Sequence, residues 1–144
     1  MADQKAPTPA EIVIMAAGAV ALIGSFLKFI GVGDIGKSAW GSGNFPIATL
    51  MVIFVVVMAV QIALTKFTNV NLPEIPGFSW VQVHLALGFV AALYAIAYLV
   101  VKTGGFERKI GFWLILIGCI GAFVGAILLS KERAGGAAPR PPTA

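Results

Sequence analysis

Four long stretches of apolar residues, separated by short polar segments, dominate this sequence. They occupy residues 12–27, 47–64, 81–101 and 110–129, and no Asp, Glu, Lys or Arg interrupts them. A helix needs about 20 residues to cross a hydrocarbon layer, so each stretch with its flanks is long enough to span a membrane. The pattern predicts an all-α fold, a four-transmembrane-helix antiparallel bundle with spans at about 10–30, 45–65, 79–101 and 109–130.

The composition supports a membrane protein with one domain. Hydrophobic residues make up 59% of the 144 residues and charged residues 11%, whereas soluble proteins carry about 25% charged residues. We expect a flexible N-terminus at residues 1–8, a four-span membrane domain at residues 9–131, and a disordered tail of Gly, Ala and Pro at residues 132–144.

Two helix starts carry the sequence signature of a capping box, in which a hydroxyl and a side-chain acceptor three residues later satisfy each other's backbone N–H groups. Thr8 and Glu11 fit this pattern before the first span, and Ser79 and Gln82 fit it before the third. The first loop, residues 31–44, contains five glycines, and we expect irregular backbone there, in the interface or in water.

The charged residues leave the orientation open. The net charge is +4, but the ten basic residues are scattered at span ends, which favours the lipid bilayer as partner over nucleic acid. They divide five against five between the two sides, so the positive-inside rule decides nothing. An even number of spans puts both termini on one side, and we expect both termini to be cytoplasmic, because a short N-terminus and a charged tail need no export.

The only histidine, His84, lies two turns into the third span. At helical spacing it shares a face with Gly88, Ala91, Ala92 and Ala95, and small residues mark faces where helices approach closely. We expect a structural role, a neutral ring bonded to a neighbouring helix or a water, with proton or ligand handling as the alternative. Gln82 and Gln61 are the other intramembrane polar candidates.

Small residues form the sharpest pattern in the fourth span, and they predict a helix-packing surface. The first span offers a matching stripe. Whether these stripes meet inside one copy, which we favour, or between two copies is open. The predicted packing residues are Gly118, Gly121 and Gly125 with Ala17, Ala21 and Gly24.

The sequence contains no recognisable group of catalytic or metal-binding residues. There is no nucleophile beside a base, the single cysteine, Cys119, excludes an intrachain disulfide, and one histidine is too few for a metal site. We therefore expect no enzyme activity, no cofactor and no metal. Trp40, Trp80 and Trp113 lie near span ends and are interpreted as interfacial anchors, with Trp40 alternatively a binding element on its loop.

Several segments together resemble a group of small, uncharacterised four-span membrane proteins of actinobacteria. These are SFL at 25–27, AWGSG at 39–43, LP at 72–73, SWVQVHLALG at 79–88, and GFWL at 111–114 leading to Gly125. The resemblance implies a plasma-membrane location with both termini inside, and it implies no activity.

Three functions fit these features. The first is a non-catalytic interaction or scaffold subunit of the cell envelope, working with other membrane proteins or as a homo-oligomer. The second is a small transporter or channel subunit, in which an oligomer lines a path with His84, Gln82 and Gln61. The third is an accessory subunit of a membrane enzyme complex whose partner holds the chemistry.

Overall fold

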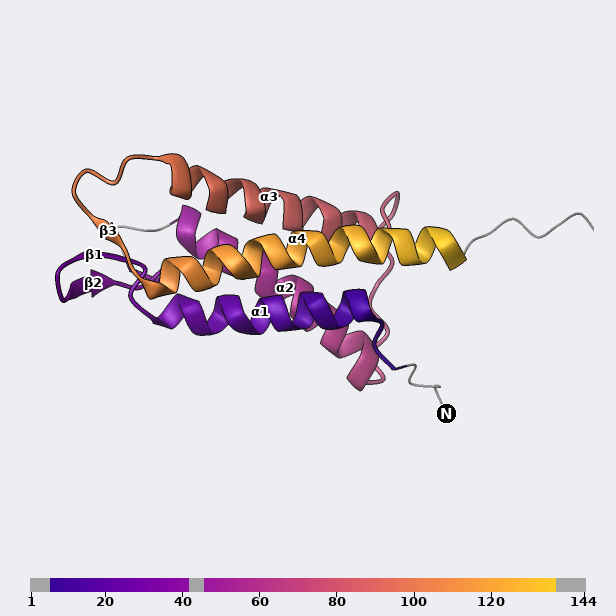
Figure 1. The fold of residues 1–144 in the computed structure, drawn as a ribbon. Coiled ribbons are helices and arrows are strands. Elements are labelled where there is room, and N and C mark those ends of the chain that lie inside the picture. Colours follow the sequence, from indigo (N-terminus) through magenta and orange to yellow (C-terminus); the bar gives the residue numbers. More distant parts are fainter. Residues whose placement is uncertain (1–5, 42–45, 137–144) are drawn as a thin grey trace, which may run out of the picture.

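The computed structural model describes residues 6–41 and 46–136, and it confirms the all-α four-helix fold. The helices are α1 (Pro9–Phe26), α2 (Ile47–Phe67), α3 (Trp80–Val100) and α4 (Ile110–Gly136). All four are long and apolar enough to cross a membrane, so the chain is a multi-pass membrane protein. The start of α1 and the end of α4 lie at the same end of the bundle, which we call the terminal end (Figure 1).

Both predicted capping boxes are present. Thr8 Oγ1 accepts from the backbone N–H of Glu11 at 3.3 Å, and Glu11 Oε2 accepts from the N–H of Thr8 at 2.9 Å. Ser79 and Gln82 make the same pair of bonds, at 3.3 and 2.9 Å, before α3. These bonds satisfy N–H groups that the first helical turn leaves free.

The opposite end, which we call the sheet end, carries a small antiparallel sheet that the sequence did not predict. Strands β1 (Ile30–Val32) and β2 (Ile35–Lys37) form a hairpin, and β3 (Glu107–Arg108) pairs with β1. Irregular backbone was therefore the wrong expectation for this part of the first loop, while residues 42–45 lie outside the described residues. Strand pairing satisfies backbone groups near the membrane, where few other partners exist.

Glycines make this hairpin possible. Gly33 begins the two-residue turn with φ +55°, a conformation that favours glycine. Gly31 lies so close to β2 that an added β-carbon would come within 2.1 Å of the carbonyl oxygen of Ile35.

Helix α1 ends at Phe26, earlier than the span predicted to residue 30, because Phe29 is held between the strands. Its N–H donates to Lys37 O at 2.8 Å, and its carbonyl accepts from Lys109 N at 3.0 Å. The Phe29 ring is buried and meets the rings of Tyr98 and Phe112 edge-on. The sheet and this aromatic cluster fasten the first loop to the third.

Helix α4 continues to Gly136, so the predicted disordered tail begins too early at residue 132. The carboxylate of Glu132 accepts a hydrogen bond from the N–H of Ala10 at 3.3 Å, which ties the last turns of α4 to the start of α1. Residues 1–5 and 137–144 lie outside the described residues.

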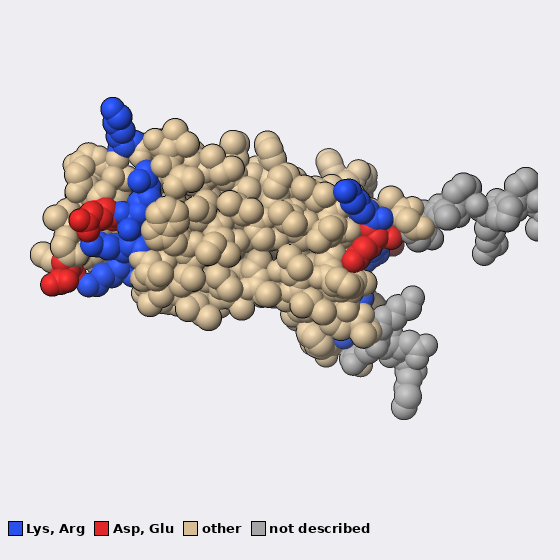
Figure 2. Space-filling view, in the orientation of Figure 1, with Lys and Arg blue, Asp and Glu red and all other residues tan. Residues whose placement is uncertain are grey.

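The helices enclose one hydrophobic core. Helix α1 packs on α2 and α4, and α3 packs on the same two helices from the other side. On the face shown in Figure 2, an uncharged band covers the middle of the molecule and charged side chains lie at its two ends. This distribution matches a bilayer core with headgroups on both sides. The largest fully buried side chains include Ile14, Met51, Met58, Phe29 and Phe112.

Candidate functional site

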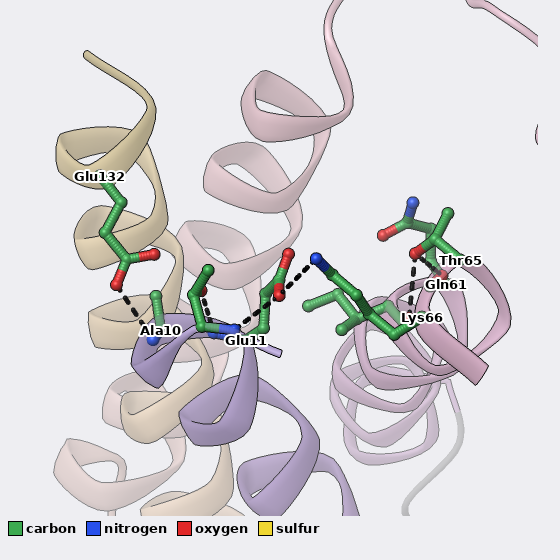
Figure 3. A network of polar contacts seen from close by, with 8 residues as sticks. Ala10, Glu11, Gln61, Thr65, Lys66 and Glu132 are labelled. Atoms are coloured by element: carbon green, nitrogen blue, oxygen red, sulfur yellow. Dashed lines mark hydrogen bonds and ion pairs between the residues drawn. The ribbon is translucent and has the colours of Figure 1, made fainter. Parts of the chain in front are cut away.

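Charged side chains from α1, α2 and α4 meet at the terminal end (Figure 3). Lys66 Nζ lies 3.1 Å from Glu11 Oε2, and the two side chains are 17% and 5% exposed. The same carboxylate oxygen accepts from the N–H of Thr8, and Glu132 of α4 accepts from the N–H of Ala10 in the first turn of α1. We call Thr8, Glu11, Lys66 and Glu132 the terminal polar cluster.

Helix electrostatics explain why this cluster forms. Glu11 lies in the first turn of α1 and Lys66 in the last turn of α2. A carboxylate favours the positive end of a helix dipole and an ammonium group favours the negative end. Because α1 and α2 run antiparallel, these two ends lie side by side. A buried charge pair of this kind fixes the relative position of the helices, because separating the two side chains would leave a buried charge without its partner.

His84 lies inside the bundle, and the residue is 1% exposed. The buried residues of α3 are His84, Gly88, Ala91, Ala92 and Ala95, which is the face that the sequence predicts. Both ring nitrogens lack a hydrogen-bond partner among the described residues, so the expected bond to a neighbouring helix is not formed there.

The other polar candidates do not join His84. Gln82 is exposed and occupied in the capping box of α3. Gln61 is partly buried, and its backbone carbonyl accepts from Thr65 Oγ1 at 2.9 Å. A path lined by all three side chains does not occur within one copy of the chain.

Small residues of α1 and α4 face each other along what we call the α1–α4 seam. A β-carbon added to Gly118 would lie 2.7 Å from Cβ of Ala21 and 2.8 Å from the carbonyl oxygen of Ala17. One added to Gly121 would lie 3.3 Å from Cβ of Ala17. The glycine stripe therefore packs inside the monomer. The seam continues through Gly125, where an added β-carbon would lie 2.6 Å from Ile14 Cγ1, and Gly24, where it would lie 2.7 Å from Leu114 Cβ.

The three tryptophans lie at both ends of the bundle. Trp40 and Trp113 lie at the sheet end with rings partly exposed, and Trp80 begins α3 at the terminal end. Trp40 donates its ring N–H to Ser25 Oγ at 2.9 Å and stacks on Phe26. These contacts hold the first loop on the end of α1.

A cleft of about 710 Å³ opens at the sheet end, between the β1–β2 hairpin and the end of α3. Lys37 and Lys102 line it with mainly apolar residues. Nearby, Lys109 Nζ lies 2.6 Å from Glu107 Oε2, and this hydrogen bond lowers the pKa of the Glu107 carboxyl.

Sequence reasoning missed the Glu11–Lys66 pair and this cleft. Opposite charges in the first turn of one span and the last turn of the next, on the same membrane side, were the available signal for the pair. The cleft had no comparable signal, because it depends on pairing between two loops far apart in the sequence.

The arrangement defines the chain as a small helical-bundle membrane protein. Within residues 6–41 and 46–136, no three His, Cys, Asp or Glu side chains gather as metal ligands would. Comparison with protein-family models, with curated proteins and with solved structures finds no match.

Proposed function

We propose that this protein is a non-catalytic interaction subunit of a membrane assembly, and that α3 is the helix that meets its partner. The observation that carries the proposal is the poor coverage of α3. In the most apolar 18-residue stretch of each helix, 28% of the α3 residues are buried inside the protein, against 39% to 50% in the other three helices. An accessory subunit of a membrane enzyme complex is one form that this role can take.

The outer face of α3 suits a partner helix. Phe89, Leu93, Ile96 and Val100 follow each other at intervals of four, three and four residues, and all are exposed. The small residue Ala97 is exposed on the same face. Large side chains beside small ones allow a second helix to approach closely and pack.

Crosslinking within the native membrane tests the proposal. In a Cys119→Ser background, Leu93→Cys should give a discrete protein adduct with a thiol-linked photocrosslinker. Val57→Cys on α2 is the matched control, because Val57 is 47% exposed and Leu93 is 50% exposed. Adducts of equal yield from both positions, or lipid adducts alone, would exclude α3 as the partner surface. The mass of the adduct separates a second copy of this chain from another protein.

A second candidate, a small transporter, is favoured by His84. A buried polar side chain without a partner calls for an explanation, and ionisable residues inside a bundle are functional candidates. If the ring moves protons, proteoliposomes should show proton flux that His84→Gln abolishes and Gln82→Ala leaves unchanged. Absence of flux with the unaltered protein would remove this candidate.

We further propose a plasma-membrane location with both termini in the cytoplasm, which places the sheet end outside. Asp34→Cys, at the exposed hairpin turn, should then react with a membrane-impermeant thiol reagent in intact cells in the Cys119→Ser background. Glu74→Cys, exposed in the loop after α2, should react only after the cells are opened. The opposite result would invert the orientation.

A further inference from the structure

The cleft at the sheet end combines an apolar wall with basic side chains. Its wall is formed by hairpin residues on one side and by the end of α3 with the following loop on the other. The apolar and aromatic residues are Ile30, Val32, Ile35, Tyr98, Val101 and Phe106. Ile35 is 82% exposed, and Val32 and Phe106 are also exposed, so this apolar rim is uncovered.

The cleft lies where the apolar helices end. Helix α3 ends at Val100 and α1 ends at Phe26, just before the hairpin. Figure 2 shows Lys and Arg side chains gathered at this end, beside the uncharged surface of the helices. This depth corresponds to the boundary between acyl chains and headgroups.

Most basic residues near the cleft are already bonded. Arg108 donates to carbonyls at the end of α3, at 2.7 to 3.2 Å, and Lys28 Nζ donates to the carbonyl of Asp34. Lys109 binds Glu107 and the carbonyl of Gly33. These cations are held by the fold.

Lys37 and Lys102 differ from them. Both line the cleft, both are exposed, and the described residues offer neither ammonium group an acid or carbonyl partner. Among the residues that the structure describes, no acidic side chain lines the cleft. The two lysines therefore line a largely apolar recess, and Asp34 and Glu107 lie at the same end of the molecule but are not part of its lining.

We infer that this cleft binds an anionic phospholipid, with the phosphate between Lys37 and Lys102 and an acyl chain along the apolar wall. The charges select an anion, and they attract anionic headgroups near the membrane surface. The wall selects an amphiphile over a soluble anion, which would gain nothing from the exposed Ile35 and Phe106 side chains. The volume lies within the range of small-molecule sites. This inference is independent of the partner proposed for α3.

Lipid binding to the purified full chain in a neutral detergent tests the inference. Native mass spectrometry should show phosphatidylglycerol retained in preference to phosphatidylcholine. The double variant Lys37→Gln/Lys102→Gln should weaken phosphatidylglycerol binding about tenfold or more. The matched control, Lys131→Gln/Arg133→Gln, removes the same charge from the terminal end and should bind as the unaltered protein does.

Four outcomes would overturn the inference. Equal weakening in the control pair would reduce the effect to net charge, and equal retention of phosphatidylcholine would leave the lysines without a role. Competition by millimolar inorganic phosphate in the absence of lipid preference would assign the site to a soluble anion. The variant Lys37→Arg/Lys102→Arg keeps the charge, so loss of binding there, with an unchanged melting temperature, would also contradict the proposal.

Discussion

At the terminal end, Glu11 and Lys66 are largely buried and bonded to each other, whereas at the sheet end Lys37 and Lys102 are exposed beside a cleft that no acid lines. The terminal end connects its helices through side chains. The sheet end connects its loops through backbone pairing. Because backbone pairing needs no charged groups, it leaves lysines free there for binding. Lys109, by contrast, is held by the fold at the same end, so the two ends differ in the two lysines that remain exposed and unbonded at the sheet end.

The largest effect is expected from a change that affects both ends, because the α1–α4 seam sets their relative position. Gly118→Leu should lower the free energy of unfolding by about 3 kcal/mol, since even a β-carbon would lie 2.7 Å from Ala21. Gly121→Leu should cost less, and Val124→Leu, on the exposed face of α4, should be nearly neutral. Thermal unfolding in detergent measures all three. Equal behaviour of the three variants would show that the seam does not limit stability.

The next largest effect should distinguish the two ends directly. Lys66→Met leaves the buried Glu11 carboxylate without its partner and should lower the free energy of unfolding by about 2 kcal/mol. Lys37→Met leaves no buried charge behind, so unfolding should be unchanged. Thermal unfolding of both variants under one detergent condition provides the measurement. If Lys37→Met were as unstable as Lys66→Met, Lys37 would also be needed for stability, and this difference between the two ends would be wrong.

A smaller effect is expected from breaking the sheet. Gly31→Val places a side chain against the backbone of Ile35 and should lower the free energy of unfolding by about 1 kcal/mol. The effect is small because the strands can separate without opening the helices. Hydrogen exchange should become faster at residues 30–37 and 107–108 and remain slow in the four helices. Ile35→Thr, at an exposed position, is the control. Faster exchange throughout α1 would mean that the sheet supports the whole bundle.

The smallest effect concerns the exposed Glu107–Lys109 pair. Glu107→Gln should leave the melting temperature unchanged, because exposed ion pairs contribute little. The lowered pKa of Glu107 means that the pair is present at neutral pH and is lost as the pH falls through that pKa. An NMR titration of the Glu107 carboxyl should show its midpoint rise in Lys109→Gln. An unchanged midpoint would show that Lys109 is not the cause.

The sequence predicts those features that depend on residues close together in the chain. The capping boxes at Thr8 and Ser79 and the buried face that contains His84 follow from local spacing. The sheet does not, because Ile30 pairs with Arg108, and two helices, α2 and α3, lie between them in the chain. The Glu11–Lys66 pair and the longer α4 likewise depend on which helix ends meet. The early end of α1 depends on the backbone bonds of Phe29 to Lys37 in β2 and to Lys109, which follows β3.

The third strand of the sheet also sets an order of events during synthesis. The β1–β2 hairpin can close soon after the ribosome releases the first loop, but Glu107–Arg108 leaves it only after α2 and α3 have been made. The edge of β1 must therefore wait while two further spans enter the membrane. The pairing of β1 with β3 is therefore completed only after the third loop has left the ribosome. A nascent chain stalled before the third loop would leave that edge of β1 without its backbone partners.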